Sequence, residues 1–381
     1  MPALHDFLKT GHTAHRKGGE AVNRFQAPTQ IISGPGAVAA LADFHPRRLM
    51  IVADPYFHEN GTAAAIGAAS QAETIQYYTH IQPDPTVALA AEGTAALKAF
   101  APDMLVALGG GSAMDCAKAM VYFSGSEASL IAIPTTSGSG SEVTDFSILT
   151  HEGVKHPLID PKLRPKAAIL DSDLLISLPP KLIADTGFDA LSHAAEAFVA
   201  TGASAITDSL AKDAFCTVLA LLPASYGGDP THRLRIHEAS TMAGLAFTQA
   251  GLGLCHAISH ALGGMYHIPH GRLNAILLPA VISCNGHAAA QKYAKLSAAA
   301  GFVGNAPAIA LRNLKNALIR LRRELALPAT LQQAGVNPLQ LRRDMEAVVK
   351  AALADPCCAT NPQRPEAFMI RRILEEVAGR V

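Results

Sequence analysis

Short apolar runs alternate with alanine-rich stretches through the first half of the chain, and this alternation is the strongest constraint on its fold. The runs are rich in Val, Ile and Leu, as expected of strands that are buried on both faces. Strand, helix, strand repetition predicts a mostly parallel sheet covered by helices. The expected strands are 47–55, 103–111 and 130–136, and the expected helices between them are 86–100 and 113–123.

The pattern changes at the segment 178–180, after which long alanine- and leucine-rich stretches dominate. Few convincing strands follow, so the second half is expected to be helical, with prolines at helix boundaries. The sequence thus predicts an N-terminal extension (1–28), an α/β domain (29–180) and an all-α domain (181–381). The expected helices of the second half are 189–199, 206–222, 308–327 and 365–377, and the boundary prolines are Pro328, Pro356 and Pro365.

Charge and composition exclude several classes of protein. With 49% hydrophobic residues the chain is expected to be globular, and its 31 Lys and Arg balance 31 Asp and Glu. Neither nucleic acid nor an anionic membrane is therefore an expected partner. The six cysteines form no Cys-x-x-Cys pair, which favours a reducing, cytoplasmic compartment. No apolar stretch approaches the roughly 18 residues that span a bilayer, so small molecules are the expected ligands.

Three consecutive glycines, Gly109–Gly111, lie between an expected strand and an expected helix. Glycines let the backbone approach a phosphate, and the N–H groups that open a helix favour an anion, so this turn is a candidate pyrophosphate site. Ser112 and Asp115 have the spacing of a capping-box-like helix start. The segment is neither a G-x-G-x-x-G fingerprint nor a P-loop, and a tight turn without a ligand is the alternative.

A second loop, 133–142, is rich in Ser, Thr and Gly and also follows an expected strand. In an open α/β sheet, ligands bind outside the carboxyl ends of the strands, where this loop would lie. Asp54 ends the strand 47–55 and could accept ribose hydroxyls while repelling a 2′-phosphate, which would select NAD over NADP. It precedes the glycine turn, contrary to the usual order, so an exposed loop aspartate is the alternative.

Histidines concentrate in one short segment of the helical half. Asp189 and His193 have the i, i+4 spacing that puts two side chains on one helix face, although an ordinary helix pair has the same spacing. An aspartate with several imidazoles suits a borderline divalent cation such as Fe²⁺ or Zn²⁺. Ala257 stands where a H-E-x-x-H metalloprotease needs Glu, so a zinc protease of that kind is not expected. The spacing leaves open which imidazoles bind among His256, His260, His267 and His270.

Four blocks in order, 109–118, 133–144, 186–198 and 251–279, resemble the iron-dependent (group III) alcohol dehydrogenases. The resemblance runs from about Gln30 to the C-terminus. Segments 249–264, 267–271 and 351–362 are similar to the alcohol dehydrogenases of propanediol- and ethanolamine-utilisation microcompartments. The family's fold, related to that of dehydroquinate synthase, implies a dinucleotide-binding α/β domain, an all-α metal-binding domain and an active site between them.

The resemblance also assigns roles to individual residues. It implies that Asp189, His193, His256 and His270 bind the metal and that His260 lies beside the nicotinamide for proton relay, while His267 has no assigned role. Asp54 becomes the expected ribose-binding acid. The pyrophosphate is expected at Gly110, Gly111, Ser112 and Asp115, and the residues expected to line the cofactor are Thr135, Thr136, Ser139, Thr144 and Lys155.

The activity implied by the resemblance is NAD(H)-linked interconversion of short-chain aldehydes and primary alcohols, with reduction of propanal or acetaldehyde as the expected direction. Three alternatives stay open: a zinc-dependent glycerol or diol dehydrogenase, a phosphate-eliminating synthase of related architecture, and a non-catalytic assembly component. The chain is expected to form a homodimer or larger assembly. Residues 2–20, with Leu4, Phe7 and Leu8 on one face of a short helix, could dock to a microcompartment shell or a neighbouring enzyme. Phe247 could line an alkyl pocket or belong to the core.

Overall fold

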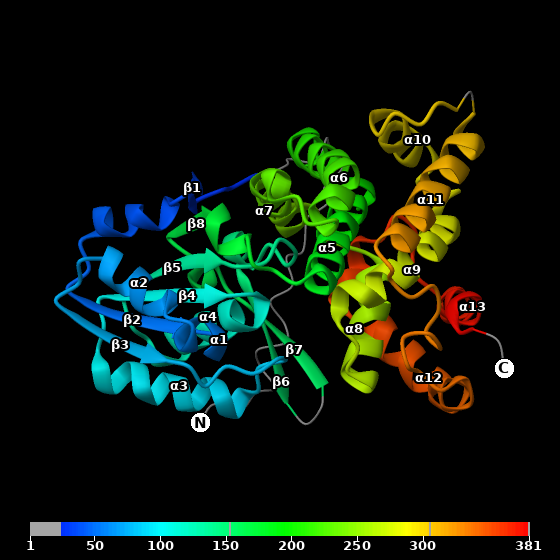
Figure 1. Ribbon diagram of the computed structural model, residues 1–381. Coiled ribbons are helices and arrows are strands. Elements are labelled where there is room, and N and C mark those ends of the chain that lie inside the picture. Colours follow the sequence, from blue (N-terminus) through cyan, green and yellow to red (C-terminus); the bar gives the residue numbers. More distant parts are fainter. Residues whose placement is uncertain (1–23, 152–153, 305, 380–381) are drawn as a thin grey trace.

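A computed structural model describes residues 24–151, 154–304 and 306–379 of the chain. The proposed docking helix within residues 2–20 lies outside these ranges. The described chain has an α/β part and a helical part that lie side by side (Figure 1). No helix of the described ranges is long and apolar enough to cross a membrane.

The α/β part is built on a six-stranded sheet in which every paired strand is parallel. The strand order is β1-β8-β5-β4-β2-β3. The three strands expected from the sequence are confirmed as β2, β4 and β5. The bounds are β1 Gln30–Gly34, β2 Arg48–Ala53, β3 Thr74–Tyr78, β4 Met104–Gly109, β5 Ser129–Pro134 and β8 Ala167–Asp171.

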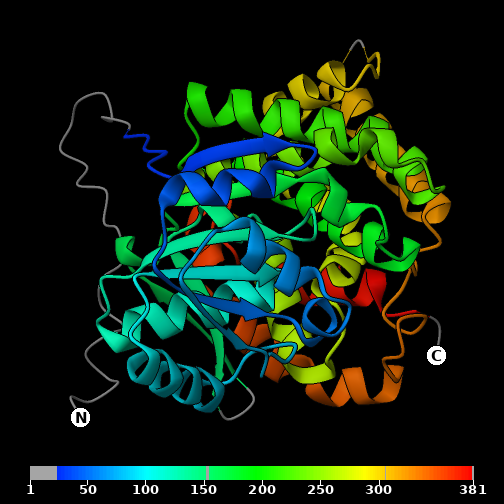
Figure 2. The same cartoon turned by 60° about the vertical axis from the view of Figure 1, so that its left-hand side comes forward.

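Helices cover both faces of the sheet, as the hydrophobic strands require (Figure 2). Alternate residues of β2 point to opposite faces: Met50 packs in one apolar cluster with residues of α3 (Val87–Phe100) and α4 (Gly111–Ser124). Ile51 packs in the other with residues of the 3₁₀ segment η2 (Ala37–Phe44) and α2 (Thr62–Ala69). The helices expected at 86–100 and 113–123 are therefore confirmed as α3 and α4.

An antiparallel hairpin, not expected from the sequence, projects from the α/β part. Strands β6 (Phe146–His151) and β7 (Val154–Ile159) form a separate two-stranded sheet, and β6 also makes one isolated bridge, between Thr150 and Thr86. β6 packs against α4, and β7 reaches α8 (Leu254–Tyr266) of the helical part. The hairpin therefore connects the covering layer of the sheet to the helical half (Figure 1).

The second half is helical, as expected, and its helices share one large apolar core. Helix α5 lies at its centre and packs against α6, α7 and α9, so that nearly every residue from Ile183 to Val199 is buried. The helix bounds are α5 Pro180–Val199, α6 Ala205–Tyr226, α7 Arg233–Ala250, α8 Leu254–Tyr266, α9 His270–Asn285, α10 Ala290–Ala299, α11 Pro307–Glu324, α12 Pro338–Ala354 and α13 Ala367–Val377.

The winding of the sheet reverses between β2 and β4. The chain goes from β2 outward to β3, then crosses back to β4 on the other side of β2. In open α/β sheets, ligands bind outside the carboxyl ends of the strands at such a reversal. Asp54 follows the end of β2, and the three glycines start at the last residue of β4, so the fold brings both sequence candidates to one edge of the sheet.

Candidate metal and cofactor site

Helix α5 supplies the first two members of the expected metal site. Asp189 and His193 lie one turn apart on a helix that is buried almost all round, and both side chains are buried. Nδ1 of His193 lies 3.9 Å from Oδ1 of Asp189. The i, i+4 spacing seen in the sequence therefore does place the carboxylate and the imidazole on the same face.

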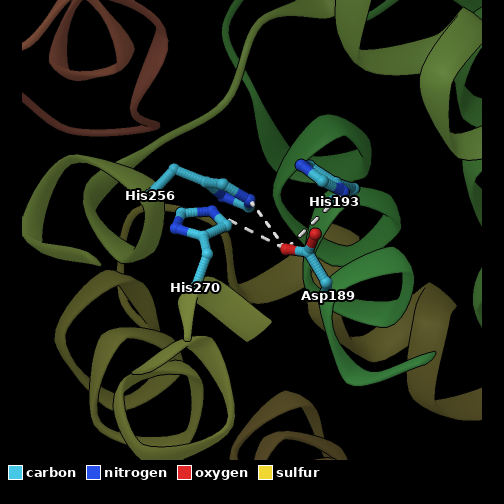
Figure 3. Close-up of side chains that lie close together, drawn as sticks. All are labelled: Asp189, His193, His256 and His270. Atoms are coloured by element: carbon cyan, nitrogen blue, oxygen red, sulfur yellow. Dashed lines mark ion pairs between the residues drawn. The ribbon is translucent and has the colours of Figure 1, made fainter. Parts of the chain in front are cut away.

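Helices α8 and α9 bring two further imidazoles to the same carboxylate (Figure 3). Nε2 of His256 lies 3.9 Å from Oδ1 of Asp189, and Nε2 of His270 lies 3.7 Å from it. The candidate ligand atoms of Asp189, His193, His256 and His270 are all within 4.8 Å of one another. Three helices thus bring one carboxylate and three imidazoles together at one point.

A glycine permits this convergence. Gly271 is the second residue of α9, and a Cβ built on it would lie 1.8 Å from the carbonyl oxygen of Asp185 and 3.1 Å from Cβ of Asp189. Any side chain there would push α9 away from α5. The absence of a Cβ therefore lets His270 reach Asp189.

Burial sets the protonation of the four side chains. It lowers the pKa of His193, and it lowers the pKa of both His256 and His270 well below the usual value, because the charged imidazoles lose their solvation. Burial also raises the pKa of Asp189. The imidazoles are therefore neutral near pH 7, with lone pairs available for a cation. One carboxylate and three neutral imidazoles suit Fe²⁺ or Zn²⁺.

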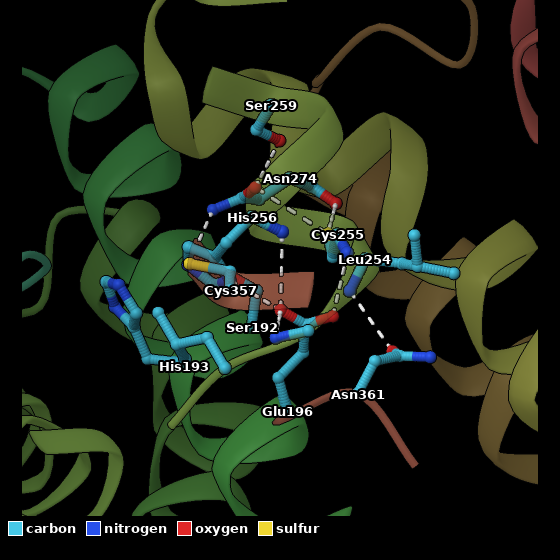
Figure 4. Close-up of polar contacts among 12 residues, drawn as sticks. Ser192, His193, Glu196, Leu254, Cys255, His256, Ser259, Asn274, Cys357 and Asn361 are labelled. Atoms are coloured by element: carbon cyan, nitrogen blue, oxygen red, sulfur yellow. Dashed lines mark hydrogen bonds and ion pairs between the residues drawn. The ribbon is translucent and has the colours of Figure 1, made fainter. Parts of the chain in front are cut away.

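Hydrogen bonds determine which nitrogen of each buried imidazole is free. Nδ1 of His193 lies 3.1 Å from the carbonyl oxygen of Gly138, which can only accept, so Nδ1 carries the hydrogen and Nε2 is free. Nδ1 of His256 donates to Oε2 of Glu196 across 2.7 Å (Figure 4), which leaves the lone pair on Nε2, 3.9 Å from Oδ1 of Asp189 and 3.3 Å from Nδ2 of Asn274. The protein thus fixes the tautomers that metal binding requires.

Glu196, which the sequence analysis did not single out, is a buried anchor for His256. Besides the imidazole, it accepts the backbone N–H groups of Gly253 (3.0 Å), Cys255 (2.7 Å) and His256 (3.3 Å) at the start of α8. Burial raises its pKa to about 7, although these N–H groups oppose the rise. A carboxylate at a helix N-terminus also complements the helix dipole. Glu196 therefore fixes both the helix and the imidazole on it.

Asn274 plays a similar part for the carboxylate. Its Nδ2 donates to Oδ1 of Asp189 across 2.8 Å, and its Oδ1 accepts the hydroxyl of Ser259 (Figure 4). Asn274 is fully buried on α9, one turn after His270. The donated hydrogen bond orients Asp189 toward the imidazoles.

His260 lies at the margin of the four-residue cluster. Its ring stacks on that of His270 with centroids 5.0 Å apart, while the centroid of His256 is 6.2 Å away. Nδ1 of His260 donates to Oδ2 of Asp355 across 2.8 Å. Burial raises the pKa of Asp355, but the hydrogen bond and charge of His260, together with hydrogen bonds from Cys357, outweigh that effect and lower the pKa overall. Asp355, from a segment 95 residues away, thus orients His260 with Nε2 free.

At the sheet edge, the ends of β2 and β4 lie side by side. The N–H of Asp54 donates to the carbonyl of Leu108 across 3.3 Å. Oδ1 of Asp54 accepts the N–H of Tyr56 and so caps α1 (Pro55–Glu59). Asp54 therefore has a defined position next to the glycine turn, with its second carboxylate oxygen free of any hydrogen bond within the described residues.

The glycine turn and the Ser/Thr-rich loop face each other. A Cβ built on Gly110 would lie 3.2 Å from Oγ1 of Thr136, and one on Gly111 would lie 3.4 Å from Oγ of Ser139. The N–H of Thr135 donates to Gly109 across 3.0 Å. The two loops that were expected to bind the cofactor are therefore neighbours in space.

The capping-box expectation for Ser112 and Asp115 is wrong. The N-cap of α4 is Gly110, and none of the described side chains caps that end. Asp115 lies inside the helix and accepts the hydroxyl of Ser141 at 3.2 Å. Because a glycine opens the helix, its first N–H groups make no hydrogen bond to a described side chain and can donate to an anion.

Asp115 belongs to a buried polar cluster behind the two loops. Lys118 is buried, whereas Asp115 is partly exposed. Nζ of Lys118 donates to the hydroxyls of Ser141 (3.0 Å) and Thr144 (2.9 Å) and to the carbonyls of Thr144 and Phe146. Burial raises the pKa of Asp115 to about 6 and lowers that of Lys118 to about 8. The hydroxyl of Thr144 is thus held by Lys118, which the sequence analysis also did not single out.

Three remaining candidates have defined contacts. Nζ of Lys155, on β7, lies 2.6 Å from Oδ1 of Asp84. His267, which had no expected role, ends α8 in the left-handed conformation and is exposed. Phe247, for which pocket and core were both open, is buried and stacks on the ring of His193 at 4.4 Å between centroids.

Two family models match almost all of the chain. The one described as "Iron-containing alcohol dehydrogenase" matches residues 28–172, and the one described as "Fe-containing alcohol dehydrogenase family, C-terminal" matches residues 183–378. The chain belongs to the iron-containing alcohol dehydrogenase family. Membership confirms the family resemblance of the sequence and the fold expected from it. It also confirms the expected activity, that of an oxidoreductase that interconverts alcohols and aldehydes with iron and NAD(H).

Individual proteins similar to this iron-containing alcohol dehydrogenase are also named as alcohol dehydrogenases or aldehyde reductases. The 1-propanol dehydrogenase PduQ of Salmonella typhimurium is 40% identical over 93% of this chain and all of its own. The NADPH-dependent butanol dehydrogenase of Clostridium saccharobutylicum is 34% identical over 92% of this chain and 97% of its own. The sulfoacetaldehyde reductase of Bifidobacterium kashiwanohense, solved with NAD⁺, is 27% identical with a TM-score of 0.85, covering 94% of this chain and 99% of its own.

Proposed function

We propose that this iron-containing alcohol dehydrogenase reduces short aldehydes, such as propanal or acetaldehyde, to primary alcohols and so regenerates NAD. The observation that carries the proposal is the cluster of one carboxylate and three neutral imidazoles, all buried except the partly exposed His270, beside a histidine that is oriented for proton transfer. Relatives named for propanol and butanol support a short primary alcohol as the product.

The metal would be held by Asp189, His193, His256 and His270, whose candidate ligand atoms lie within 4.8 Å of one another. A bound Fe²⁺ supplies a Lewis acid that polarises the substrate oxygen. Glu196 and Asn274 orient two of the four side chains through hydrogen bonds. Their role is to hold His256 and Asp189 in the orientation for metal binding even before a cation is present.

The dinucleotide would lie along the carboxyl edge of the sheet. Among the described residues, no side chain pairs with the N–H groups at the start of α4, which suit the pyrophosphate, or with the second carboxylate oxygen of Asp54, which suits a ribose with two hydroxyls. The nicotinamide supplies the hydride in aldehyde reduction. Gly138 connects the two sites, because the loop that faces the glycine turn also accepts the Nδ1–H of His193.

The proton that completes the alcohol would come through His260. Asp355 accepts the hydrogen on Nδ1, so Nε2 is the atom that exchanges a proton with the substrate side. An imidazole suits this role because it changes charge near neutral pH. Phe247 packs on His193 and shields that side of the metal cluster from water.

The three alternatives are less well supported. Relatives named for propanol and butanol do not favour a glycerol or diol dehydrogenase. A phosphate-eliminating synthase should need additional basic residues at the site, and Lys155 already pairs with Asp84. A non-catalytic assembly component would have no need of the oriented His260 and Asp355 pair.

Metal removal and reloading test the proposal. The protein is stripped with a chelator, divided, and one half is reloaded anaerobically with Fe²⁺ before NADH oxidation is followed with propanal. We expect turnover only in the reloaded half, and none in reloaded Asp189→Asn protein, which keeps the size of the side chain but loses its charge. Turnover by the stripped protein, or by the reloaded variant at the wild-type rate, would refute the metal assignment.

We further propose that the enzyme works as a homodimer or larger assembly, and that residues 2–20 dock it inside a bacterial microcompartment. Strand β1 is an edge of the sheet and pairs only with β8 among the described residues, which leaves one side of it for a second copy. Light scattering checks the first point, since a monomer at micromolar concentration contradicts it. Deletion of residues 2–20 checks the second, since unchanged targeting in cells contradicts a docking role for that segment.

A further inference from the structure

A second cluster of metal-ligand side chains lies next to the four-residue site. His260, Asp355 and Cys357 each offer one ligand atom, and the three atoms are within 4.8 Å of one another. None of these residues belongs to the set of one carboxylate and three imidazoles. The cluster contains a thiol, which the first site lacks, and Cys357 is a free cysteine and partly exposed.

The local structure orients the three ligands before any ion binds. Asp355 is the N-cap of the 3₁₀ segment η7 (Pro356–Thr360), and its Oδ1 accepts the N–H of Cys357 across 2.8 Å. This leaves Oδ2 for the imidazole of His260, at 2.8 Å. One short turn of chain therefore holds the carboxylate and the thiol on the same side, toward α8.

Two further contacts join η7 to the start of α8, the helix that carries His260. The hydroxyl of Thr360 donates to the carbonyl of Leu252 across 2.7 Å. Oδ1 of Asn361 accepts the N–H of Leu254 across 3.2 Å (Figure 4). The ligands on the two segments are thus fixed relative to each other, although they are distant in sequence.

We propose that His260, Asp355 and Cys357 form a second, inhibitory site for a thiophilic divalent cation such as Zn²⁺ or Cd²⁺. One sulfur, one nitrogen and one oxygen are ligands that Zn²⁺ accepts, with water in the fourth position. Ligand bonds of about 2.0–2.3 Å in a tetrahedron put the ligand atoms roughly 3.3–3.8 Å apart, so only small shifts are needed. The thiolate and the carboxylate together neutralise the cation.

The ligand types also separate this site from the first. A thiolate favours Zn²⁺ or Cd²⁺ over Mg²⁺ and Ca²⁺, which prefer oxygen ligands. The four-residue site offers nitrogen and oxygen only, so it can keep Fe²⁺ while the thiol-containing site takes the softer ion. Binding releases the thiol proton of Cys357 to solvent, and the affinity therefore increases with pH.

Occupation of this site would stop proton relay, and this part of the inference rests on the proposed role of His260. The cation takes the lone pair of Nδ1, and the hydrogen held there in the hydrogen bond to Asp355 moves to Nε2. Nε2 then has no lone pair with which to take up the next proton. The enzyme keeps its iron and its cofactor site but cannot turn over.

The test titrates the iron-loaded enzyme with Cd²⁺ and follows two signals, the ultraviolet cadmium–thiolate charge-transfer absorption and the rate of propanal reduction. We expect one Cd²⁺ to bind per chain with iron retained, and both signals to saturate at the same Cd²⁺ concentration. In Cys357→Ser, the absorption should be lost and inhibition should need at least about tenfold more Cd²⁺. Each variant is compared with its own rate without Cd²⁺.

Cys358→Ser is the matched control. Its thiol is the next in sequence but donates to the carbonyl of Ala352 across 3.0 Å, away from the cluster. It should keep both the absorption and the inhibition. Loss of both in Cys358→Ser, or absorption that persists in Cys357→Ser, overturns the site. Release of iron in proportion to Cd²⁺ bound also overturns it, because the ion is then in the first site.

The two signals separate this inference from the proposed function. If the iron-loaded enzyme does not reduce propanal at all, the proposed function fails, while the absorption and the metal stoichiometry still decide whether the second site exists. Absorption that depends on Cys357 without any loss of rate overturns the inhibitory role.

Discussion

The Oε2 atom of Glu196 accepts Nδ1–H of His256 across 2.7 Å, and the same carboxylate accepts the first backbone N–H groups of the helix that carries this histidine. One buried carboxylate therefore sets the tautomer, the ring orientation and the position of a metal-ligand candidate. Mutation of a carboxylate that holds a metal-binding histidine in this way typically lowers the metal affinity by about 10- to 100-fold.

Glu196→Gln tests this relationship. The amide keeps the size but offers one acceptor oxygen in place of two, so His256 should lose its fixed tautomer. We expect Fe²⁺ and Zn²⁺ affinity, measured by competition with a chelator, to decrease by about 10- to 100-fold. Glu92→Gln, at an exposed position of α3, should have no effect. Equal metal affinity in both variants would mean that Glu196 does not position His256.

Gly271→Ala should separate two helices that the metal site needs close together. The new methyl would lie 1.8 Å from the carbonyl of Asp185, so α9 must move away from α5 and take His270 with it. Overpacking of this kind costs about 1–3 kcal/mol of unfolding free energy. We expect lower thermal stability together with weaker metal binding, measured by calorimetry on the stripped and reloaded protein.

Gly263→Ala provides the comparison for Gly271→Ala. Gly263 lies inside α8, and the atom nearest to a Cβ built there is 3.6 Å away, an ordinary contact. Alanine is better than glycine in a helix by about 1 kcal/mol. This variant should be as stable as wild type or more stable, with unchanged metal affinity. Similar losses in the two variants would contradict the close-approach argument.

The sequence was sufficient for the parts of the fold that depend on local pattern. Buried parallel strands, their helices and the i, i+4 pair of Asp189 and His193 follow from periodicity, and the structure has them. The hairpin β6–β7 was missed because its strands follow a loop whose hydroxyls and glycines dominate the local signal. The local pattern therefore predicts the layers of the fold and the residues that share one face of a helix.

Long-range pairing was not accessible in the same way. Asp355 contacts His260 across 95 residues, and a lone aspartate before a proline carries no signal of that contact. Lys118 was missed for a similar reason, since its acceptors follow on another segment. Glu196 had a local signal that went unused: it lies seven residues after Asp189 and therefore on the same face of α5.

Asp115 makes the stability of the α/β part depend on pH. Burial raises its folded-state pKa to about 6, above the 3.8 of an unfolded aspartate. The folded state therefore holds the extra proton between these values. The stabilisation is complete below pH 3.8 and is lost as the pH rises through 6. The full change is about 3 kcal/mol, at 1.36 kcal/mol per pKa unit.

Asp115→Asn removes this titration while keeping the size and the contact with Ser141. We expect the unfolding free energy of the variant, relative to wild type, to rise between pH 4 and 6, measured by urea denaturation of the metal-free protein. Asp43→Asn, at an exposed position of η2, should run parallel to wild type. A constant difference between Asp115→Asn and wild type over this range would show that Asp115 does not titrate there.

Asp355→Asn should slow turnover without removing the metal or the cofactor. The amide can present its NH₂ to Nδ1 of His260 and favour the wrong tautomer, so Nε2 would lose its lone pair. General acid–base steps contribute about 10²–10⁴-fold, and we expect kcat to decrease within that range while metal content and NADH affinity stay unchanged. Asp344→Asn, which loses only a contact with Tyr266, should keep wild-type kcat. A proportional loss of metal in Asp355→Asn would indicate a structural role instead.

Asp54 should decide between the two nicotinamide dinucleotides. One of its oxygens caps α1. The other lies beside the glycine turn with no hydrogen bond to a described residue, where a ribose 2′-hydroxyl can donate to it and a 2′-phosphate is repelled. Asp54→Asn keeps a helix cap of similar quality and removes the charge. We expect the preference for NADH over NADPH, as the ratio of kcat/KM values, to fall by roughly tenfold or more, which is about 1.4 kcal/mol.

The change should come mainly from KM, because the carboxylate is remote from the reacting carbon. Thermal stability should stay at the wild-type value, since the cap is kept, and a lower stability with an unchanged cofactor ratio would mean that Asp54 serves the helix alone.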